Sequence, residues 1–112
     1  GACLFVRAAA FHAVGGFDGD FFAHMEEVDL CWRLWNRGYE VWYCGDSTVY
    51  HVGGGTLHKT NPHKAFLNFR NGLALMYKNH PAENFYRNLF VRLVLDGVAG
   101  LKFLLADDPR EC

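Results

Sequence analysis

Apolar and polar residues alternate with a helical period in four stretches of the chain. Glycine or proline lies just beyond three of them, at Gly15, Gly38 and Pro81, and these residues commonly stop a helix. The pattern therefore predicts four helices, over residues 8–14, 26–37, 61–79 and 82–106.

The same spacing predicts which faces of the helices are buried. In the second helix an apolar face and a polar face run side by side, and we expect the apolar face to pack on a core. The apolar face holds Val28, Cys31, Trp32 and Trp35, and the polar face holds Glu26, Asp29, Arg33 and Arg37. The inward positions of the third helix are Phe66, Phe69, Leu73, Met76 and Tyr77.

Between the helices, β-branched and aromatic residues predict three short strands. These are residues 2–6, 39–44 and 47–52, with a turn at Gly45-Asp46. Residues 17–22 mix turn residues with aromatic ones and are expected to form an ordered loop. Three glycines, Gly53 to Gly55, come two residues after His51, so we expect the segment to about Thr60 to be mobile or shaped by a ligand.

The last helix is mostly apolar from Leu89 to Leu105, but Arg92, Asp96 and Lys102 interrupt it. Three charges argue against a membrane span. Because the charges fall on one side, the pattern is typical of an amphipathic helix. Such a helix packs on the protein's own core or lies on a membrane surface, and the sequence leaves both open.

Composition narrows the class of protein. The chain has 112 residues, of which 51% are hydrophobic and 16% aromatic, so it is long and apolar enough for one domain with a core. A net charge of -1 without a basic stripe disfavours nucleic-acid binding. Four widely spaced cysteines form no C-x-x-C pair, which favours free thiols in a reducing cytoplasm, with Cys31 and Cys44 as small core residues. The first and last residues suggest a piece of a longer protein.

Three carboxylates open the second helix, at Glu26, Glu27 and Asp29. Partial positive charge at a helix start keeps such acids ionised, and an ionised carboxylate beside a cleft can act as a base. The alternative is structural, because acidic residues are common in the first turn of helices and Asp29 is well spaced to pair with Arg33.

Four motifs together resemble the family 2 glycosyltransferases of the GT-A fold. They are Gly1 to Arg7, Val14 to Asp18, Glu26 to Arg33 and Tyr50 to Gly55, in the order found in that family. The resemblance implies an α/β protein with a partial GT-A fold, a Rossmann-like nucleotide-diphospho-sugar transferase. Residues 1–60 would be the acceptor-side, C-terminal half of the catalytic domain, and residues 61–112 a trailing helical extension.

The activity that the resemblance implies is inverting sugar transfer from a nucleotide-sugar donor to a glycan or lipid-linked acceptor. The setting is bacterial cell-surface polysaccharide synthesis, in the cytoplasm or peripherally at the inner face of the membrane. A divalent metal, Mg²⁺ or Mn²⁺, would be held mainly by the missing first half. Alone, this part is expected to be inactive and to self-associate through uncovered strand edges.

Residue roles follow from the same resemblance. Glu27 matches the base that takes the acceptor's proton, with Glu26 or Asp29 able to share the work. His51 matches a histidine that approaches the metal or the diphosphate. Substrate contacts are implied for Asp18, Phe21, Phe22, Arg33, Gly54, Gly55, Thr56 and Arg70. Asp18-Gly19-Asp20 has the letters of the family's metal motif in the wrong place, and core packing is expected for Trp32, Trp35 and Trp42.

Two other functions compete with sugar transfer. One is a non-catalytic module in which the last helices bind a membrane or a partner and the acids are structural. The other is a metal-dependent hydrolase, which would release free sugar.

Overall fold

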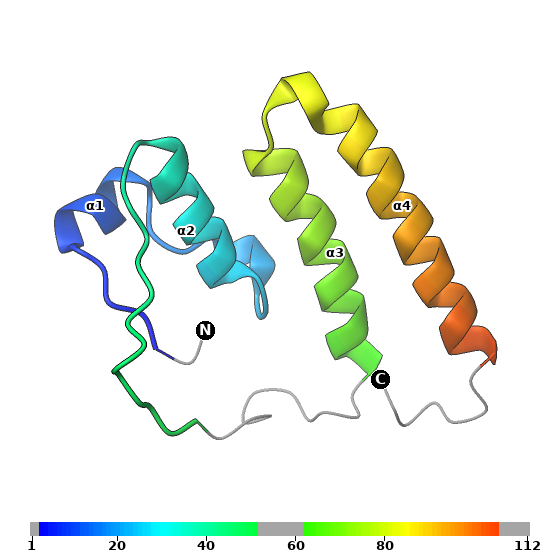
Figure 1. Ribbon diagram of the computed structural model, residues 1–112, viewed down its shortest axis with the longest axis horizontal. Helices are drawn as coiled ribbons and strands as arrows, with labels where there is room; N and C mark the ends of the chain where they lie inside the picture. Colours follow the sequence, from blue (N-terminus) through cyan, green and yellow to red (C-terminus); the bar gives the residue numbers. More distant parts are fainter. Residues whose placement is uncertain (1–2, 52–61, 106–112) are drawn as a thin grey trace. The chain divides into compact units, whose positions relative to one another are not determined.

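The computed structural model describes residues 3–51 and 62–105 (Figure 1). Within them, the elements are α1 (Ala8–Ala13), a short 3-10 helix η1 (Gly19–Phe21), α2 (Glu26–Asn36), α3 (Pro62–Asn79) and α4 (Ala82–Leu105). The four helices predicted from the pattern are confirmed, each with ends within a few residues of the expected ones. The chain divides into two compact units, Gly1–Gly53 and Gly54–Cys112.

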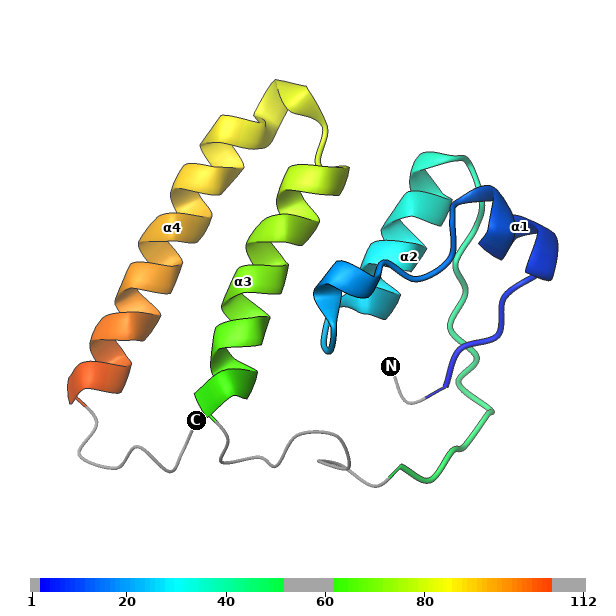
Figure 2. The same cartoon turned by 180° about the vertical axis from the view of Figure 1, so that it is seen from behind.

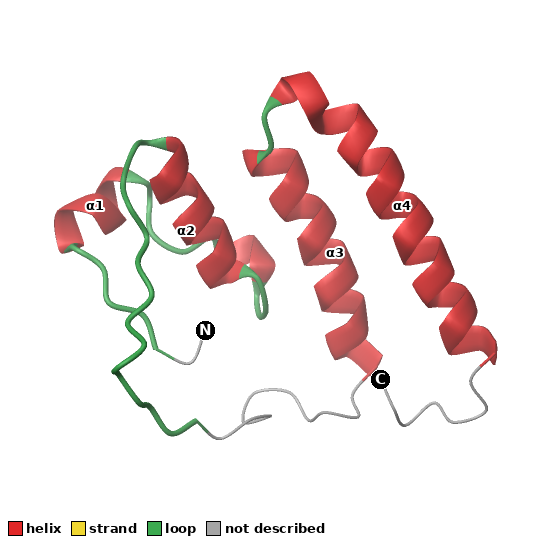
Figure 3. Ribbon diagram, in the orientation of Figure 1, coloured by secondary structure: helices red, strands yellow, loops and turns green. Residues whose placement is uncertain are grey.

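No strand is present in the described part of the chain (Figure 3). The residues predicted as strands that fall within it, 3–6, 39–44 and 47–51, run without strand pairing on either side of a turn at Gly45-Asp46. Their side chains are largely exposed. A strand needs a neighbour to accept its backbone hydrogen bonds, and strand propensity alone does not supply one. The α/β class stays a prediction that depends on such neighbours.

A small apolar core joins α1 to α2. Ala10 of α1 and Val14, which directly follows that helix, meet Leu30 and Leu34 of α2, and Phe11 packs against this cluster. These positions are spaced by four residues on each helix, so each helix contributes one stripe. The core therefore holds the second half of α2, one turn beyond the carboxylates, against α1.

Both helices of this unit end in the same way. After α1, the N–H of Gly16 donates to the carbonyl of Phe11 at 2.9 Å and that of Gly15 to His12 at 3.0 Å. After α2, the N–H groups of Tyr39 and Gly38 repeat the pattern on Leu34 and Trp35. This is the Schellman motif, in which the residue after the helix takes a positive φ. The helix ends predicted at these glycines are confirmed.

Replacing Gly16 with alanine is expected to destabilise this unit by about 2 to 4 kcal/mol, because φ is +69° there and a Cβ would lie 3.0 Å from the Phe11 ring. Gly15→Ala is the matched control, since φ is +85° but no atom lies within 4 Å. It carries the backbone strain alone, about 1 to 2 kcal/mol. Urea unfolding followed by tryptophan fluorescence measures both, and equal losses would show that the Phe11 ring moves aside freely.

The face of α2 that packs on the core is not the predicted one. Leu30 and Leu34 are buried, whereas Val28 is 40% and Trp35 74% exposed, with Cys31 between these extremes. The helix has two apolar faces, and periodicity does not tell which of them meets the core. The expectation of a buried stripe is therefore wrong for Val28 and Trp35, whereas Cys31 and Trp32 are half-buried.

In the second unit, α3 and α4 form an antiparallel hairpin through His80 and Pro81, as two opposite views show (Figures 1 and 2). Phe69 meets Phe103 edge to face at 6.3 Å between ring centroids. Near the turn, Tyr77 and His80 meet Phe85, at 6.2 and 6.4 Å. Leu67 and Leu75 are buried in α3, whereas Phe66 and Tyr77, predicted to point inward, are exposed.

Candidate functional site

The candidate site is the start of α2, where Glu26, Glu27 and Asp29 all lie in the first turn. The backbone N–H groups of that turn carry partial positive charge and have no partners further along the helix. Glu26 and Glu27 are partly exposed, whereas Asp29 is fully buried. The three acids therefore have different surroundings although they share one turn.

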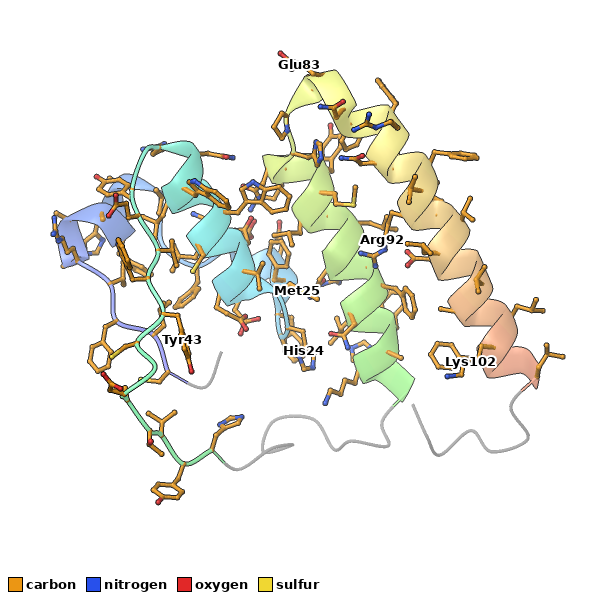
Figure 4. All side chains as sticks on the ribbon, in the orientation of Figure 1. His24, Met25, Tyr43, Glu83, Arg92 and Lys102 are labelled. Atoms are coloured by element: carbon orange, nitrogen blue, oxygen red, sulfur yellow. The ribbon has the colours of Figure 1, made fainter. Side chains whose placement is uncertain are left out.

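The backbone that leads into this turn is strained. Phe22 has φ +60° and ψ -62°, and the N–H of Ala23 donates to the carbonyl of Phe21 at 2.7 Å, which makes a γ-turn with positive φ. His24 and Met25 follow with φ of +68° and +72° (Figure 4). Positive φ costs free energy in residues other than glycine and clusters at functional sites. The position of Glu26 and Glu27 is therefore set by a costly local conformation.

Glu27 is held in its charged form. The pKa of its carboxyl group lies below the ordinary value in this chain: burial acts to raise it, whereas the positively charged terminal amine, a backbone hydrogen bond and, least of all, the charge of His24 act to lower it. The carboxyl is thus ionised at neutral pH, as a proton acceptor must be. One carboxylate oxygen of Glu26 is buried and accepts no hydrogen bond from the described residues.

Cys31 lies one turn after Glu27, and the two side chains influence each other. Burial raises the pKa of the Cys31 thiol, and the negative charge of Glu27 raises it further. Cys31 is thus kept as an uncharged thiol and is unsuited to act as a nucleophile. Cys3 and Cys44, also free thiols, are exposed, so the expectation that Cys44 is a core residue is wrong.

Alkylation of Cys31 by iodoacetamide is expected to need a higher pH than that of an ordinary cysteine, because a raised pKa leaves less thiolate at any given pH. Glu27→Gln removes a negative charge and should shift the alkylation profile of Cys31 to lower pH. Mass spectrometry of peptides labelled over a pH series measures each site. The profiles of Cys3 and Cys44 serve as internal controls, and an unshifted Cys31 profile would contradict the proximity of Glu27.

Asp29 and Arg33 form the pair that their spacing predicted. Arg33 Nε donates to Asp29 Oδ2 at 2.7 Å, and Arg33 Nη2 lies 2.7 Å from the same oxygen. The guanidinium also donates to the carbonyls of Val14, at 2.5 Å, and Gly16, at 2.7 Å, just beyond the end of α1. One cation thus joins α2 to the turn after α1, with help from Arg37, which donates to the carbonyl of Ala13.

This geometry separates the candidate roles. Asp29 is buried and bound to Arg33, so it supports the positioning alternative rather than a part as base. Arg33 is likewise engaged within the protein, with 19% of its side chain exposed, and its implied substrate contact stays a prediction. Among the three acids, Glu26 and Glu27 keep partial exposure and remain the candidates for chemistry.

Two cavities lie in the first unit. The larger, about 770 Å³, is lined by residues 3–7 together with residues from α1, α2 and the segment 38–49. The second, about 640 Å³, lies along α2 and is lined by Val28, Cys31, Trp32, Trp35 and residues 39–42. Neither has Glu26, Glu27 or Asp29 in its lining.

The remaining predicted contacts are scattered. Asp18 accepts a hydrogen bond from the N–H of Asp20 at 2.9 Å and so caps η1. Phe21 is buried and Phe22 is 72% exposed, and the acceptor contact expected of both stays a prediction. Arg70, in the other unit, donates to Asn71 Oδ1 at 2.9 Å. Gly54, Gly55 and Thr56 lie outside the described residues.

A metal site is not formed by the described residues alone. His51 is exposed, and no three histidine, cysteine or acidic side chains within residues 3–51 and 62–105 come close enough to hold an ion. The described part of the chain therefore does not fit a resident metal, and the expected Mg²⁺ or Mn²⁺ stays a prediction.

Two features of the first unit were not predicted from the sequence. The strained turn at residues 22–25 contains no glycine or asparagine, which are the usual signals of positive φ. The second cavity, which lies along α2, has exposed Trp35 and Trp42 in its lining, whereas their sequence positions favoured core packing. The sequence signal that could have indicated this cavity is the second apolar face of α2, which does not pack on the core shared with α1.

Comparison with known proteins finds two relatives. Over 51 residues, the chain is 47% identical to N-acetylglucosaminyl-diphospho-decaprenol L-rhamnosyltransferase from Mycobacterium tuberculosis strains CDC 1551 / Oshkosh and ATCC 25618 / H37Rv. The matched stretch is 46% of this chain and 17% of each relative. No family model and no solved structure matches. The chain is thus similar, over a little under half of its length, to proteins named as glycosyltransferases.

Proposed function

We propose that this chain is part of a glycosyltransferase that transfers a sugar from a nucleotide-sugar donor to a lipid-linked acceptor in cell-wall synthesis. The observation that carries the proposal is the 47% identity over 51 residues to a rhamnosyltransferase whose name specifies a diphospho-decaprenol acceptor. The GT-A fold, family 2 membership and the inverting course belong to the same proposal. So do the division into an acceptor-side half and a helical extension, and a cytoplasmic location at the membrane.

In the proposed reaction, the acceptor hydroxyl attacks the anomeric carbon from the face opposite the nucleoside diphosphate. The bond from that carbon to the diphosphate oxygen breaks, and Glu27 takes the hydroxyl proton as the new bond forms. The place of Glu27 at the positive end of α2, where a carboxylate is kept ionised, supports this role. Residues outside the described part would complete the cleft around it and hold the divalent ion.

A non-catalytic module is the second candidate function. The observation that favours it is the fully buried Asp29, which is bound to Arg33 and serves the packing of α1 on α2. In that case the helix would carry acids for structural reasons, and no sugar would be transferred by any longer form of the protein.

A transfer assay separates these functions. The protein is produced with the sequence that extends it in its genome, and a panel of labelled nucleotide sugars is offered with lipid-linked acceptors in detergent. Label that enters the lipid phase supports the transferase. Release of free sugar would favour a hydrolase, and intact donor throughout would favour the binding module. Repeating the assay with chelator and then with Mg²⁺ or Mn²⁺ tests the metal.

A further inference from the structure

In α4 the side chains that face the partner helix are mostly polar or small, and the large apolar side chains are exposed, which is the reverse of a helix that packs in water. Its half-buried positions form one stripe with a spacing of three or four residues, and most of that stripe is polar or small. They are Phe85, Asn88, Leu89, Arg92, Asp96, Ala99 and Gly100. A helix packed on its partner in water normally buries its large apolar side chains and exposes its charges.

The charged pair of α4 faces α3. Arg92 Nε donates to Asp96 Oδ1 at 2.7 Å, so the two charges satisfy each other. A Cβ added to Gly72 of α3 would lie 2.9 Å from both terminal nitrogens of Arg92, which shows how closely the guanidinium approaches that helix (Figure 4). Glycine thus makes room for a cation inside the hairpin.

The opposite side of α4 is apolar and exposed. Its residues follow helical spacing over the last four turns, and each is about half exposed or more: Phe90, Val94, Val98, Leu101 and Leu105. We name these five residues the outer face of α4. Exposed Arg87 and Lys102 lie near its two ends. No helix of the described part is both long and apolar enough to pass through a bilayer.

The helices α3 and α4 together carry more basic than acidic side chains. Residues 62–105 carry six basic side chains against two acidic ones, and one of the two acids is paired with Arg92. The basic residues are Lys64, Arg70, Lys78, Arg87, Arg92 and Lys102, and the acids are Glu83 and Asp96. Of the six, Arg87 and Lys102 are the exposed basic residues at the two ends of the outer face, and an apolar face flanked by basic side chains is complementary to anionic lipid headgroups above acyl chains.

We propose that the outer face of α4 docks on the surface of an anionic lipid bilayer, with Arg87 and Lys102 contacting lipid phosphates. The apolar side chains enter the boundary between headgroups and acyl chains, and the long basic side chains reach back to the headgroups. The Arg92–Asp96 pair stays between the helices, away from lipid, where charged groups of membrane-contacting helices are normally found.

Vesicle flotation of the 112-residue chain tests this proposal. We expect the chain to float with vesicles of equal parts phosphatidylcholine and phosphatidylglycerol and to bind weakly to phosphatidylcholine alone. The double variant Val94→Gln/Leu101→Gln keeps the charge and replaces exposed residues, and binding should fall by about a hundredfold because two apolar side chains no longer leave water. Arg87→Gln and Lys102→Gln should each weaken binding about fivefold on anionic vesicles only.

Phe66→Gln is the matched control, since Phe66 is an exposed apolar residue of α3 in the same unit and its loss should leave binding unchanged. Circular dichroism of every variant verifies that the helices remain. Equal flotation of the parent and the Val94→Gln/Leu101→Gln variant would overturn the proposal, as would equal binding to neutral and anionic vesicles. Self-association that this variant abolishes, without flotation of the parent, would assign the outer face to a protein contact. Vesicle binding needs no sugar chemistry, so its result is independent of the transfer assay.

Discussion

Replacing Glu27 with glutamine is expected to lower sugar transfer by the extended protein about 100- to 10,000-fold, the usual contribution of a positioned general base. Glutamine keeps the shape of the side chain and its place in the first turn of α2. It cannot accept the acceptor's proton, so the loss should fall on turnover and leave donor binding as it was. Single-turnover transfer together with donor titration by calorimetry separates the two.

Glu26→Gln is the matched control for this experiment. Glu26 lies in the same turn and is also partly exposed, but the resemblance places the proton acceptor one residue later. We expect less than a tenfold loss of turnover from it. Full turnover with Glu27→Gln would remove Glu27 from the mechanism, and a larger loss with Glu26→Gln would move the base to the neighbouring residue.

Replacing Arg33 with methionine is expected to destabilise the first unit by about 3 to 5 kcal/mol, the cost of leaving a buried charge without its partner. Asp29 is fully buried, and the carbonyls of Val14 and Gly16 lose their donor at the same time. Methionine keeps much of the length and apolar contact of the arginine stem. Urea unfolding followed by fluorescence reports on this unit because all three tryptophans lie in it.

Two further variants show where that loss originates. Arg37→Met removes an exposed arginine that donates to one carbonyl, that of Ala13, and should cost about 1 kcal/mol or less. Asp29→Leu/Arg33→Met removes both charges and should recover a large part of the stability lost with Arg33→Met. If Arg33→Met lowered the free energy of unfolding no more than Arg37→Met does, Asp29 would have to be hydrated rather than buried.

The helices of this chain were predictable because their signals are local. Gly15 and Gly38 marked the ends of α1 and α2, and both helices stop there through the same pair of backbone hydrogen bonds. The Asp29–Arg33 pair followed from the pitch of a helix and is present. Each of these features depends on residues within one or two turns, so a single sequence contains the information.

Features that depend on distant partners were predicted less well. Arg33 also binds the carbonyls of Val14 and Gly16, seventeen to nineteen residues away, and no pattern marks a backbone carbonyl as an acceptor. The strands at 39–44 and 47–51 need a neighbouring strand that the described residues do not provide. For α2 and α4 the apolar faces were visible in the sequence, but which face meets another helix is decided by the rest of the fold.

The turn before α2 constrains which sequences can share this site. Phe22, His24 and Met25 hold a left-handed backbone that β-branched side chains tolerate poorly. Valine, isoleucine or threonine at these positions would unwind the entrance to the helix, whereas glycine, asparagine or aspartate would adopt it at lower cost. Homologues that keep glutamates at positions 26 and 27 should therefore prefer glycine, asparagine or aspartate at positions 22, 24 and 25. Substitutions at these three positions would then reflect selection for the backbone conformation and not for side-chain chemistry.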